Sequence, residues 1–116
     1  MEALEARTIC IDIDHTLCVP ARPQEYKDAS SIPGASEVLR SLRRDGWIVV
    51  LLTGRHFNHW KTTVDWLAEN GFEYDQIVFG KPPARFYIDD RAIPFEGDWE
   101  SLRARIPSLT GTEQEH

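Results

Sequence analysis

Short apolar runs alternate with segments of helical periodicity, and this alternation limits the available folds more than any other feature of the chain. The apolar runs predict buried strands at residues 7–13, 47–52, 76–79 and 85–88. Apolar residues at helical spacing predict a helix from residue 35 that ends at Asp45-Gly46, a helix from residue 57 that ends at Asn70-Gly71, and a helix at residues 98–106 that is capped by Asp98. Strands that alternate with helices form right-handed crossovers and a parallel sheet. We therefore expect an α/β fold with a three-layer Rossmann-like parallel sheet and helices on both faces.

The chain is the length of one domain. It has 116 residues, of which 41% are hydrophobic and 28% are charged, which is ordinary for a globular protein. We predict a single domain over residues 1–106, with a proline-rich flap at residues 16–33 and a polar C-terminal tail at residues 107–116.

Two classes of partner are disfavoured by composition. The longest apolar run, residues 47–52, is far shorter than the ~20 residues of a membrane-spanning helix, and the first residues lack the pattern of a signal peptide. We therefore expect no membrane partner and a cytoplasmic location. The net charge of −6 also argues against duplex nucleic acid, whose phosphates require surplus Lys and Arg.

Neither Cys10 nor Cys18 has the setting of a nucleophile or a disulfide, and Cys10 is expected to be a small buried side chain.

Polar residues follow every predicted strand, at the edge of a parallel sheet where ligands bind. They are Asp12, Asp14 and His15, then Thr53, Gly54 and Arg55, then Lys81, then Asp89 and Asp90. Asp12 and Asp14 are two residues apart, so on a strand both carboxylates face the same side. Such a pair suits either a Mg²⁺ site or a division of labour between a nucleophile and a general acid/base. Asp89 comes within reach of Asp12 if the first and fourth strands are neighbours.

The remaining strand ends suit a phosphate group. A Thr hydroxyl and free backbone N–H groups at the start of a helix form a phosphate seat, and Gly54 allows the backbone to approach closely. Lys81 lies between Gly80 and two prolines that stiffen its surroundings. An ammonium group placed there can neutralise an attacking carboxylate and a phosphoryl oxygen together.

The ordered set Asp12-x-Asp14-x-Thr16, Thr53, Lys81 and Asp89-Asp90 resembles the four motifs of the haloacid dehalogenase (HAD) superfamily of phosphohydrolases. The motifs span Ile9 to Arg91 in family order, each after a predicted strand. Their short spacing resembles the small phosphatases found with capsule and surface-polysaccharide biosynthesis genes, which have no cap domain. The resemblance therefore implies a phosphatase whose site is open to solvent.

Roles for individual residues follow from this resemblance. It implies that Asp12 is the nucleophile, that Asp14 is the general acid/base, and that Thr53, Gly54 and Lys81 hold the phosphoryl group. It also implies Mg²⁺ bound by Asp12, by the backbone carbonyl of Asp14 and by Asp89. Three further residues are expected to support the site or to contact substrate: Asp90, His15 and Arg55. His15 stands where the family often has Gly, and His tolerates a left-handed backbone at modest cost.

The function expected from these features is hydrolysis of a phosphomonoester, through an aspartyl phosphate, with a small sugar phosphate or nucleotide as substrate. A homo-oligomer would offer one way to cover the open site. Two alternatives stay open: a polynucleotide 3′-end phosphatase, and a catalytically silent domain that binds a phosphorylated ligand. The acidic balance of the chain counts against the first alternative, and the intact Asp12–Asp14 pair counts against the second.

Overall fold

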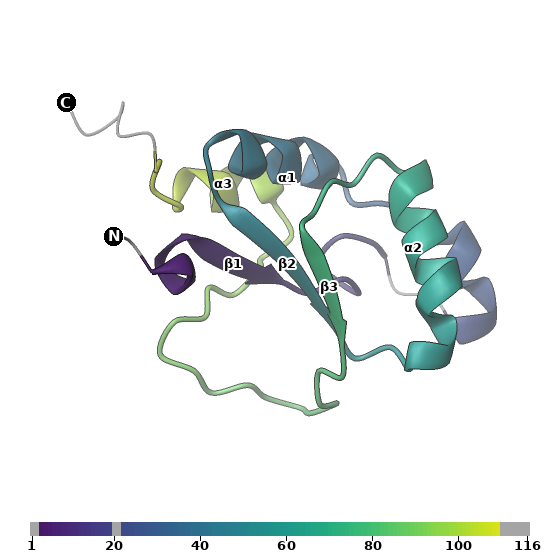
Figure 1. Cartoon of the computed structure of the whole chain (residues 1–116). Helices are drawn as coiled ribbons and strands as arrows, with labels where there is room; N and C mark the ends of the chain where they lie inside the picture. Colours follow the sequence, from purple (N-terminus) through teal and green to yellow (C-terminus); the bar gives the residue numbers. More distant parts are fainter. Residues whose placement is uncertain (1–2, 20–21, 110–116) are drawn as a thin grey trace.

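Three parallel strands form the centre of the molecule in this computed structural model, which describes residues 3–19 and 22–109 (Figure 1). They are β1 (Thr8–Ile11), β2 (Ile48–Thr53) and β3 (Gln76–Phe79), in the spatial order β1-β2-β3. Ile11 is in register with Leu51, and Thr53 is in register with Phe79. The three strands therefore end close together, and the parallel sheet predicted from the sequence is confirmed.

Helices connect the strands as the apolar spacing predicts. The α-helices are α1 (Ala35–Arg44), α2 (Trp60–Glu69) and α3 (Trp99–Ala104). Single 3₁₀ segments occur at η1 (Leu4–Arg7), η2 (Pro23–Asp28) and η3 (Phe57–His59). The first turn of the helix predicted from residue 57 is thus 3₁₀. The cap predicted at Asp98 is confirmed, because its carboxylate accepts hydrogen bonds from the backbone N–H groups of Glu100 and Ser101.

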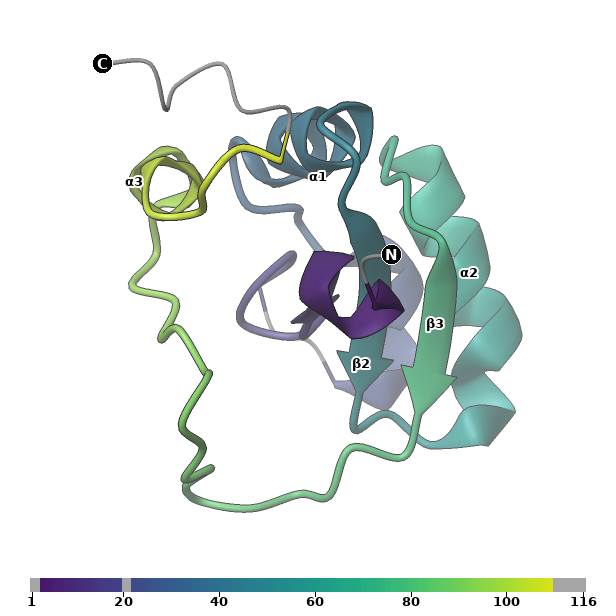
Figure 2. The ribbon, with the colours of Figure 1, turned by 60° about the vertical axis from the view of Figure 1, so that its left-hand side comes forward.

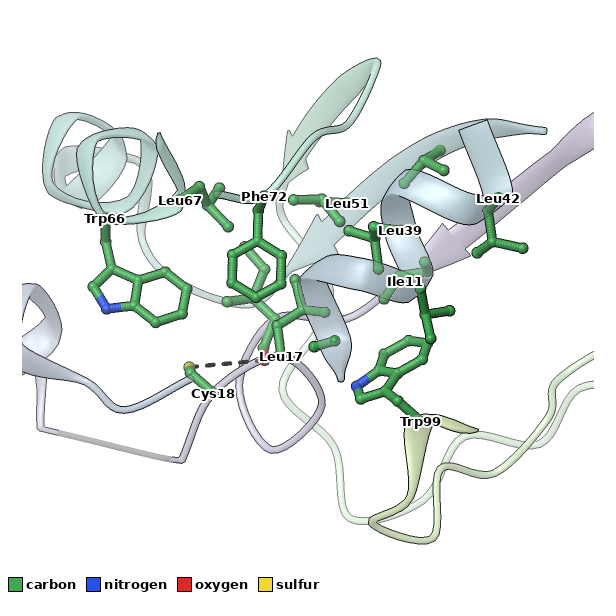
Figure 3. Close-up of a cluster of buried hydrophobic side chains, with 14 residues drawn as sticks. Ile11, Leu17, Cys18, Leu39, Leu42, Leu51, Trp66, Leu67, Phe72 and Trp99 are labelled. Atoms are coloured by element: carbon green, nitrogen blue, oxygen red, sulfur yellow. Dashed lines mark hydrogen bonds between the residues drawn. The ribbon is translucent and has the colours of Figure 1, made fainter. Parts of the chain in front are cut away.

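One hydrophobic core holds the strands and helices together (Figure 3). On β2 the fully buried residues are Val49, Leu51 and Thr53, and the residues between them are only half-buried. Both α1 and α2 contribute side chains to the cluster that contains Val49 and Leu51, through residues such as Leu39 and Leu67. The two crossover helices therefore cover the same face of the sheet.

Helices on both faces were expected, and here the structure differs from the prediction. The strand order β1-β2-β3 means that each crossover moves one place in the same direction across the sheet. Two right-handed crossovers in the same direction place both of their helices on the same side. Within the described residues, the second face of β2 therefore keeps Ile48, Val50 and Leu52 partly exposed.

The predicted fourth strand at residues 85–88 is wrong. Residues 82–98, here named the connecting segment, run from the end of β3 to α3 as an irregular loop that swings away from the sheet (Figure 2). Ile88 is 100% exposed, and Phe86 and Tyr87 are also exposed. The run Phe86–Ile88 is apolar enough for a strand, but it does not lie along the edge strand β1, so its backbone joins no ladder.

The loops between the strands contain no additional domain among the described residues. The flap predicted at residues 16–33 is irregular apart from η2, and residues 20–21 lie outside the described residues, as do residues 110–116 of the predicted tail. The start of that tail is held in place, since the Ser108 hydroxyl donates to Asp45 and Pro107 accepts from the Trp47 indole. No helix in the described part of the chain is long and apolar enough to cross a bilayer.

Candidate active site

The loop after β1 places the first two predicted site residues. Its backbone turns tightly, because the carbonyl of Ile13 accepts from the N–H groups of Thr16 and Leu17. His15 adopts a left-handed conformation with φ of 66° and is the only described non-glycine residue with positive φ. The left-handed backbone expected at this position is confirmed. It lets the chain reverse directly after Asp14.

Asp12 and Lys81 meet across the carboxyl ends of β1 and β3. The ammonium Nζ of Lys81 lies 3.0 Å from Oδ2 of Asp12, and the other oxygen, Oδ1, accepts from the N–H of Ile13 at 2.8 Å. Both side chains are only partly exposed. Lys81 also lies over the ring of Tyr87, 4.5 Å from its centroid. Asp12 is therefore held by a cation on one oxygen and by a backbone donor on the other.

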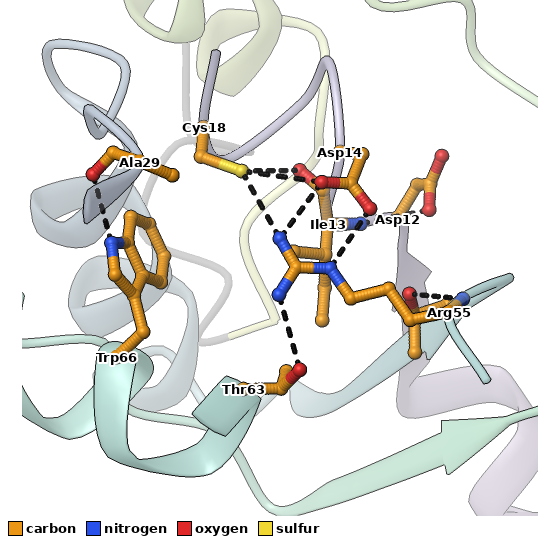
Figure 4. Close-up of polar contacts among 9 residues, drawn as sticks. Asp12, Ile13, Asp14, Cys18, Ala29, Arg55, Thr63 and Trp66 are labelled. Atoms are coloured by element: carbon orange, nitrogen blue, oxygen red, sulfur yellow. Dashed lines mark hydrogen bonds and ion pairs between the residues drawn. The ribbon is translucent and has the colours of Figure 1, made fainter. Parts of the chain in front are cut away.

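Asp14 is held differently, by the buried guanidinium of Arg55 (Figure 4). Nε and Nη2 of Arg55 donate to the two carboxylate oxygens at 3.0 and 2.8 Å, a bidentate pair. The Arg55 side chain is 1% exposed and that of Asp14 is 27% exposed. Nη1 of Arg55 donates to Thr63 at 3.1 Å, and the guanidinium lies 3.7 Å from the ring centroid of Tyr26. Arg55 thus points at Asp14 and away from solvent.

Cys18 completes this cluster. Its Sγ lies 3.6 Å from Oδ1 of Asp14 and 3.7 Å from Nη2 of Arg55. Burial, and next the nearby charge of Asp14, raise the pKa of the Cys18 thiol to about 12. The thiol therefore stays protonated at neutral pH and serves as a weak hydrogen-bond donor.

The charges within the cluster favour ionised Arg55. Burial by itself lowers the pKa of its guanidinium, but the hydrogen bonds and charge of Asp14 outweigh burial, so the pKa lies above its ordinary value. Burial, and then the charge of Asp14, likewise raise the pKa of Tyr26. An arginine that stays charged at every accessible pH fixes the position of Asp14 by electrostatics as well as by packing.

Thr53 and Gly54 lie at the end of β2, the strand between β1, which leads to Asp12 and Asp14, and β3, which leads to Lys81. Thr53 is fully buried, and its hydroxyl accepts from the backbone N–H of Arg55 at 3.1 Å. Its carbonyl accepts from the N–H groups of both Gly80 and Lys81. A Cβ at Gly54 would lie 3.1 Å from the carbonyl oxygen of Lys81. The loops after β2 and β3 are therefore in close backbone contact, and the role of Thr53 and Gly54 in binding phosphate stays a prediction.

Asp89 and Asp90 are not brought to the other carboxylates. Both are exposed on the connecting segment, where Asp89 accepts from the N–H of Arg91, and Asp90 lies 4.0 Å from the Arg91 guanidinium. In the ranges 3–19 and 22–109, no three His, Cys, Asp or Glu side chains are grouped closely enough to hold a metal ion. In this arrangement the residues do not fit Mg²⁺. The ligand set Asp12, Asp14 and Asp89 stays a prediction.

Sequence analysis missed three residues of the cluster: Cys18, Tyr26 and Thr63. None belongs to a motif, and each is recognisable only once the buried guanidinium of Arg55 is seen to need partners. The burial expected for Cys10 is wrong, since its side chain is exposed. Neighbouring residues of a strand point to opposite faces, and Cys10 faces away from the core that contains Ile11.

Comparison with known families gives one match over most of the chain. Residues 9–90 match the family model described as "PITM 1-3, LNS2 domain". A protein of Chlorobaculum tepidum named "Putative 5'(3')-deoxyribonucleotidase" is 31% identical over 86 residues, which cover 66% of this chain and 42% of the relative. The chain thus spans less than half of the length of this relative.

Two solved structures share the architecture. A crystal structure of a Vibrio cholerae protein superposes with a TM-score of 0.69 at 25% identity, covering 93% of this chain and 94% of the other. D,D-heptose 1.7-bisphosphate phosphatase from B. bronchiseptica, crystallised with magnesium and phosphate, has a TM-score of 0.53 at 19% identity, covering 74% and 54%. The second similarity concerns the fold alone.

Proposed function

The chain belongs to the family described as "PITM 1-3, LNS2 domain" and to the haloacid dehalogenase superfamily, and from this premise we propose that it hydrolyses phosphomonoesters through Asp12. The observation that carries the proposal is the contact between Asp12 and Lys81, 3.0 Å apart at the carboxyl ends of the strands. A carboxylate beside an ammonium group can approach a phosphate dianion that it would otherwise repel.

In the first step, an oxygen of Asp12 attacks phosphorus and the bond from phosphorus to the leaving oxygen breaks. Lys81 offsets the charge on the phosphoryl oxygens. The leaving oxygen takes a proton from the carboxyl group of Asp14, and the product is an aspartyl phosphate together with an alcohol.

In the second step, the Asp14 carboxylate takes a proton from water, whose oxygen attacks phosphorus and releases phosphate and free Asp12. The bidentate contact with Arg55 suits this step, because both oxygens of Asp14 are acceptors in it. The acid step needs a proton on Asp14, and a protonated carboxyl group cannot accept from both donors of Arg55 in the same way. The proposal therefore requires this pair to loosen once in each cycle.

We also propose that the enzyme depends on magnesium, which requires the connecting segment to bring Asp89 to Asp12 when the ion binds, and that its substrate is small, either a sugar phosphate or a nucleotide. Support for magnesium comes from the B. bronchiseptica phosphatase of the same fold, which was crystallised with magnesium and phosphate. Support for a nucleotide comes from the name of the Chlorobaculum tepidum relative. Cover of the open site by a second copy of the chain remains part of the same proposal.

One observation favours a second candidate, a domain that binds a phosphorylated ligand without turnover. The connecting segment holds Asp89 on an exposed loop, where it accepts from Arg91. If Asp89 stays there when ligand binds, a phosphate could still contact Lys81 while the carboxylates lacked a bridging cation.

The test is release of phosphate from para-nitrophenyl phosphate with Mg²⁺, compared with the same protein after metal removal by a chelator. We expect turnover with Mg²⁺ and its loss with chelator, and we expect no turnover by Asp12→Asn in either condition. Full activity after verified metal removal would overturn the magnesium part alone. Phosphate binding without turnover in all conditions would favour the silent domain.

A further inference from the structure

A pocket lies beside the reacting groups, at the ends of β2 and β3. Two loops line it, residues 54–57 and residues 79–83, and its volume is about 300 Å³. Lys81 belongs to this lining and also contacts Asp12. A ligand whose phosphate lies at Asp12 would therefore extend its other end into this pocket.

Two residues of the pocket lining are aromatic. Phe57 and Phe79 both line it, with ring centroids 5.4 Å apart and planes at 87°. Trp60 stacks against Phe57 from α2, at 6.5 Å and 22°. Despite these two neighbours, Phe57 is 63% exposed. Folding therefore leaves an aromatic ring held in position and open to solvent, which is the arrangement of a stacking platform.

The pocket lining also carries a cation that contacts Asp12. The Lys81 ammonium is the charge that faces Asp12, whereas the Arg55 guanidinium is turned away into its pair with Asp14. The lining thus offers a cation beside Asp12, which suits a phosphate group, and the exposed Phe57, which suits a flat apolar ring. A sugar phosphate offers only the first of these features, and a nucleoside monophosphate offers both.

We infer that this pocket binds the base of a nucleoside monophosphate, stacked on Phe57, with its phosphate at Asp12 and Lys81. The inference rests on the proposed function for the position of the phosphate. A volume of about 300 Å³ is at the lower limit for small-ligand sites, which favours one nucleotide over a polynucleotide. The net charge of −6 also disfavours a polyanion.

The experiment compares nucleoside 5′- and 3′-monophosphates with ribose 5-phosphate, which carries the phosphate without a base. Stacking on an aromatic side chain contributes enough to raise kcat/KM by roughly 10-fold or more for the nucleotides. Phe57→Leu should reduce this advantage by about the same factor and leave ribose 5-phosphate within about 2-fold. Phe86→Leu, which changes an exposed phenylalanine outside the pocket lining, is the matched control and should preserve the ratio between the substrates.

A binding measurement separates this inference from the proposed function. Asp12→Asn is titrated by calorimetry with the same nucleotides and with ribose 5-phosphate, which requires no turnover. Tighter nucleotide binding that Phe57→Leu removes supports the inference, even if no phosphatase activity is found. Turnover of all substrates at equal efficiency, unaffected by Phe57→Leu, would overturn the inference and leave the proposed function standing.

Discussion

Two regions of this molecule carry predicted site carboxylates, and they hold them in opposite ways. At the ends of β1 and β2, Asp14 lies against the buried Arg55, and among the described residues no buried side-chain nitrogen or oxygen lacks a partner. In the connecting segment, Asp89 is exposed and accepts from the backbone of Arg91, two residues further along. Buried contacts between distant segments of the chain therefore fix the position of Asp14, whereas Asp89 is held by a local turn.

The largest effect on turnover is expected from substitutions of Asp12 and Asp14. Asp12→Asn keeps the shape of the side chain but removes the nucleophile, so turnover should fall by at least ~10³-fold. Asp14→Asn keeps the nucleophile and loses the acid/base. With a good leaving group, its intact mass should show a phosphorylated protein that Asp12→Asn never shows. Near wild-type turnover by Asp12→Asn would instead favour direct attack by water.

Arg55→Met tests whether the buried contact with Arg55 holds Asp14 in place. It leaves the Asp14 carboxylate without its bidentate partner, so we expect the free energy of unfolding to fall by about 2–4 kcal/mol. Denaturant unfolding measures this change. The double variant Arg55→Met, Asp14→Leu is the control and should recover part of the loss, since no unpaired charge remains. An equal loss in both variants would mean that packing around Arg55 matters more than its charge.

Lys81→Met should lower kcat by roughly 10²-fold, because its ammonium contacts the reacting carboxylate. The effect on kcat should exceed that of Arg55→Met measured on folded protein, since Arg55 faces away from the substrate. Lys61→Met is the matched control: Lys61 is an exposed lysine paired with Asp65 on α2, and its loss should leave kcat unchanged. A greater loss of kcat in Arg55→Met would place the phosphate nearer to Arg55 than we propose.

Asp75, just before β3, tests a smaller contribution within the packed region. It accepts from the N–H of Val49 and from Arg43, and these contacts, in that order, lower the pKa of its carboxyl group. Its stabilisation is therefore present above about pH 4 and is lost as the pH falls through the lowered pKa.

Asp75→Asn should lower the free energy of unfolding by about 0.5–1 kcal/mol at pH 7, a small effect because the pair is partly hydrated. The difference from wild type should narrow below about pH 4. Glu73→Gln, which changes a longer contact to the same arginine, is the control and should have less effect. A difference between wild type and Asp75→Asn that stays constant down to pH 2 would contradict the assigned cause.

Ile88→Ala should have the smallest effect on the free energy of unfolding. It tests most directly whether the connecting segment is less tightly packed than the core. Because Ile88 is fully exposed, its truncation should change the free energy of unfolding by less than about 0.5 kcal/mol. Leu51→Ala in the core is the comparison and should cost about 2–5 kcal/mol. A cost for Ile88 near that of Leu51 would mean that the connecting segment packs against the sheet in solution, as the predicted fourth strand requires.

Sequence patterns predict the packed region better than the connecting segment, for a physical reason. Sequence patterns place the strand at residues 76–79 and the helix after Asp98 correctly, because a short apolar run and a helix cap are local signals. Residues 85–88 have the same apolar composition, but a strand exists only where a neighbour supplies hydrogen bonds. For the same reason, the partners of Arg55 could not be predicted: Cys18, Tyr26 and Thr63 are distant in sequence and meet it only through the fold.

The close approach at Gly54 limits how this site can be redesigned. Any side chain there would meet the carbonyl oxygen of Lys81 at 3.1 Å, a backbone atom that cannot rotate aside, so the ends of β2 and β3 would have to separate. Position 54 should therefore be enriched in glycine in a saturation library selected for activity. Phe57 is largely exposed and meets no such restriction. Substitutions at Phe57 can therefore change substrate preference more readily than substitutions at Gly54.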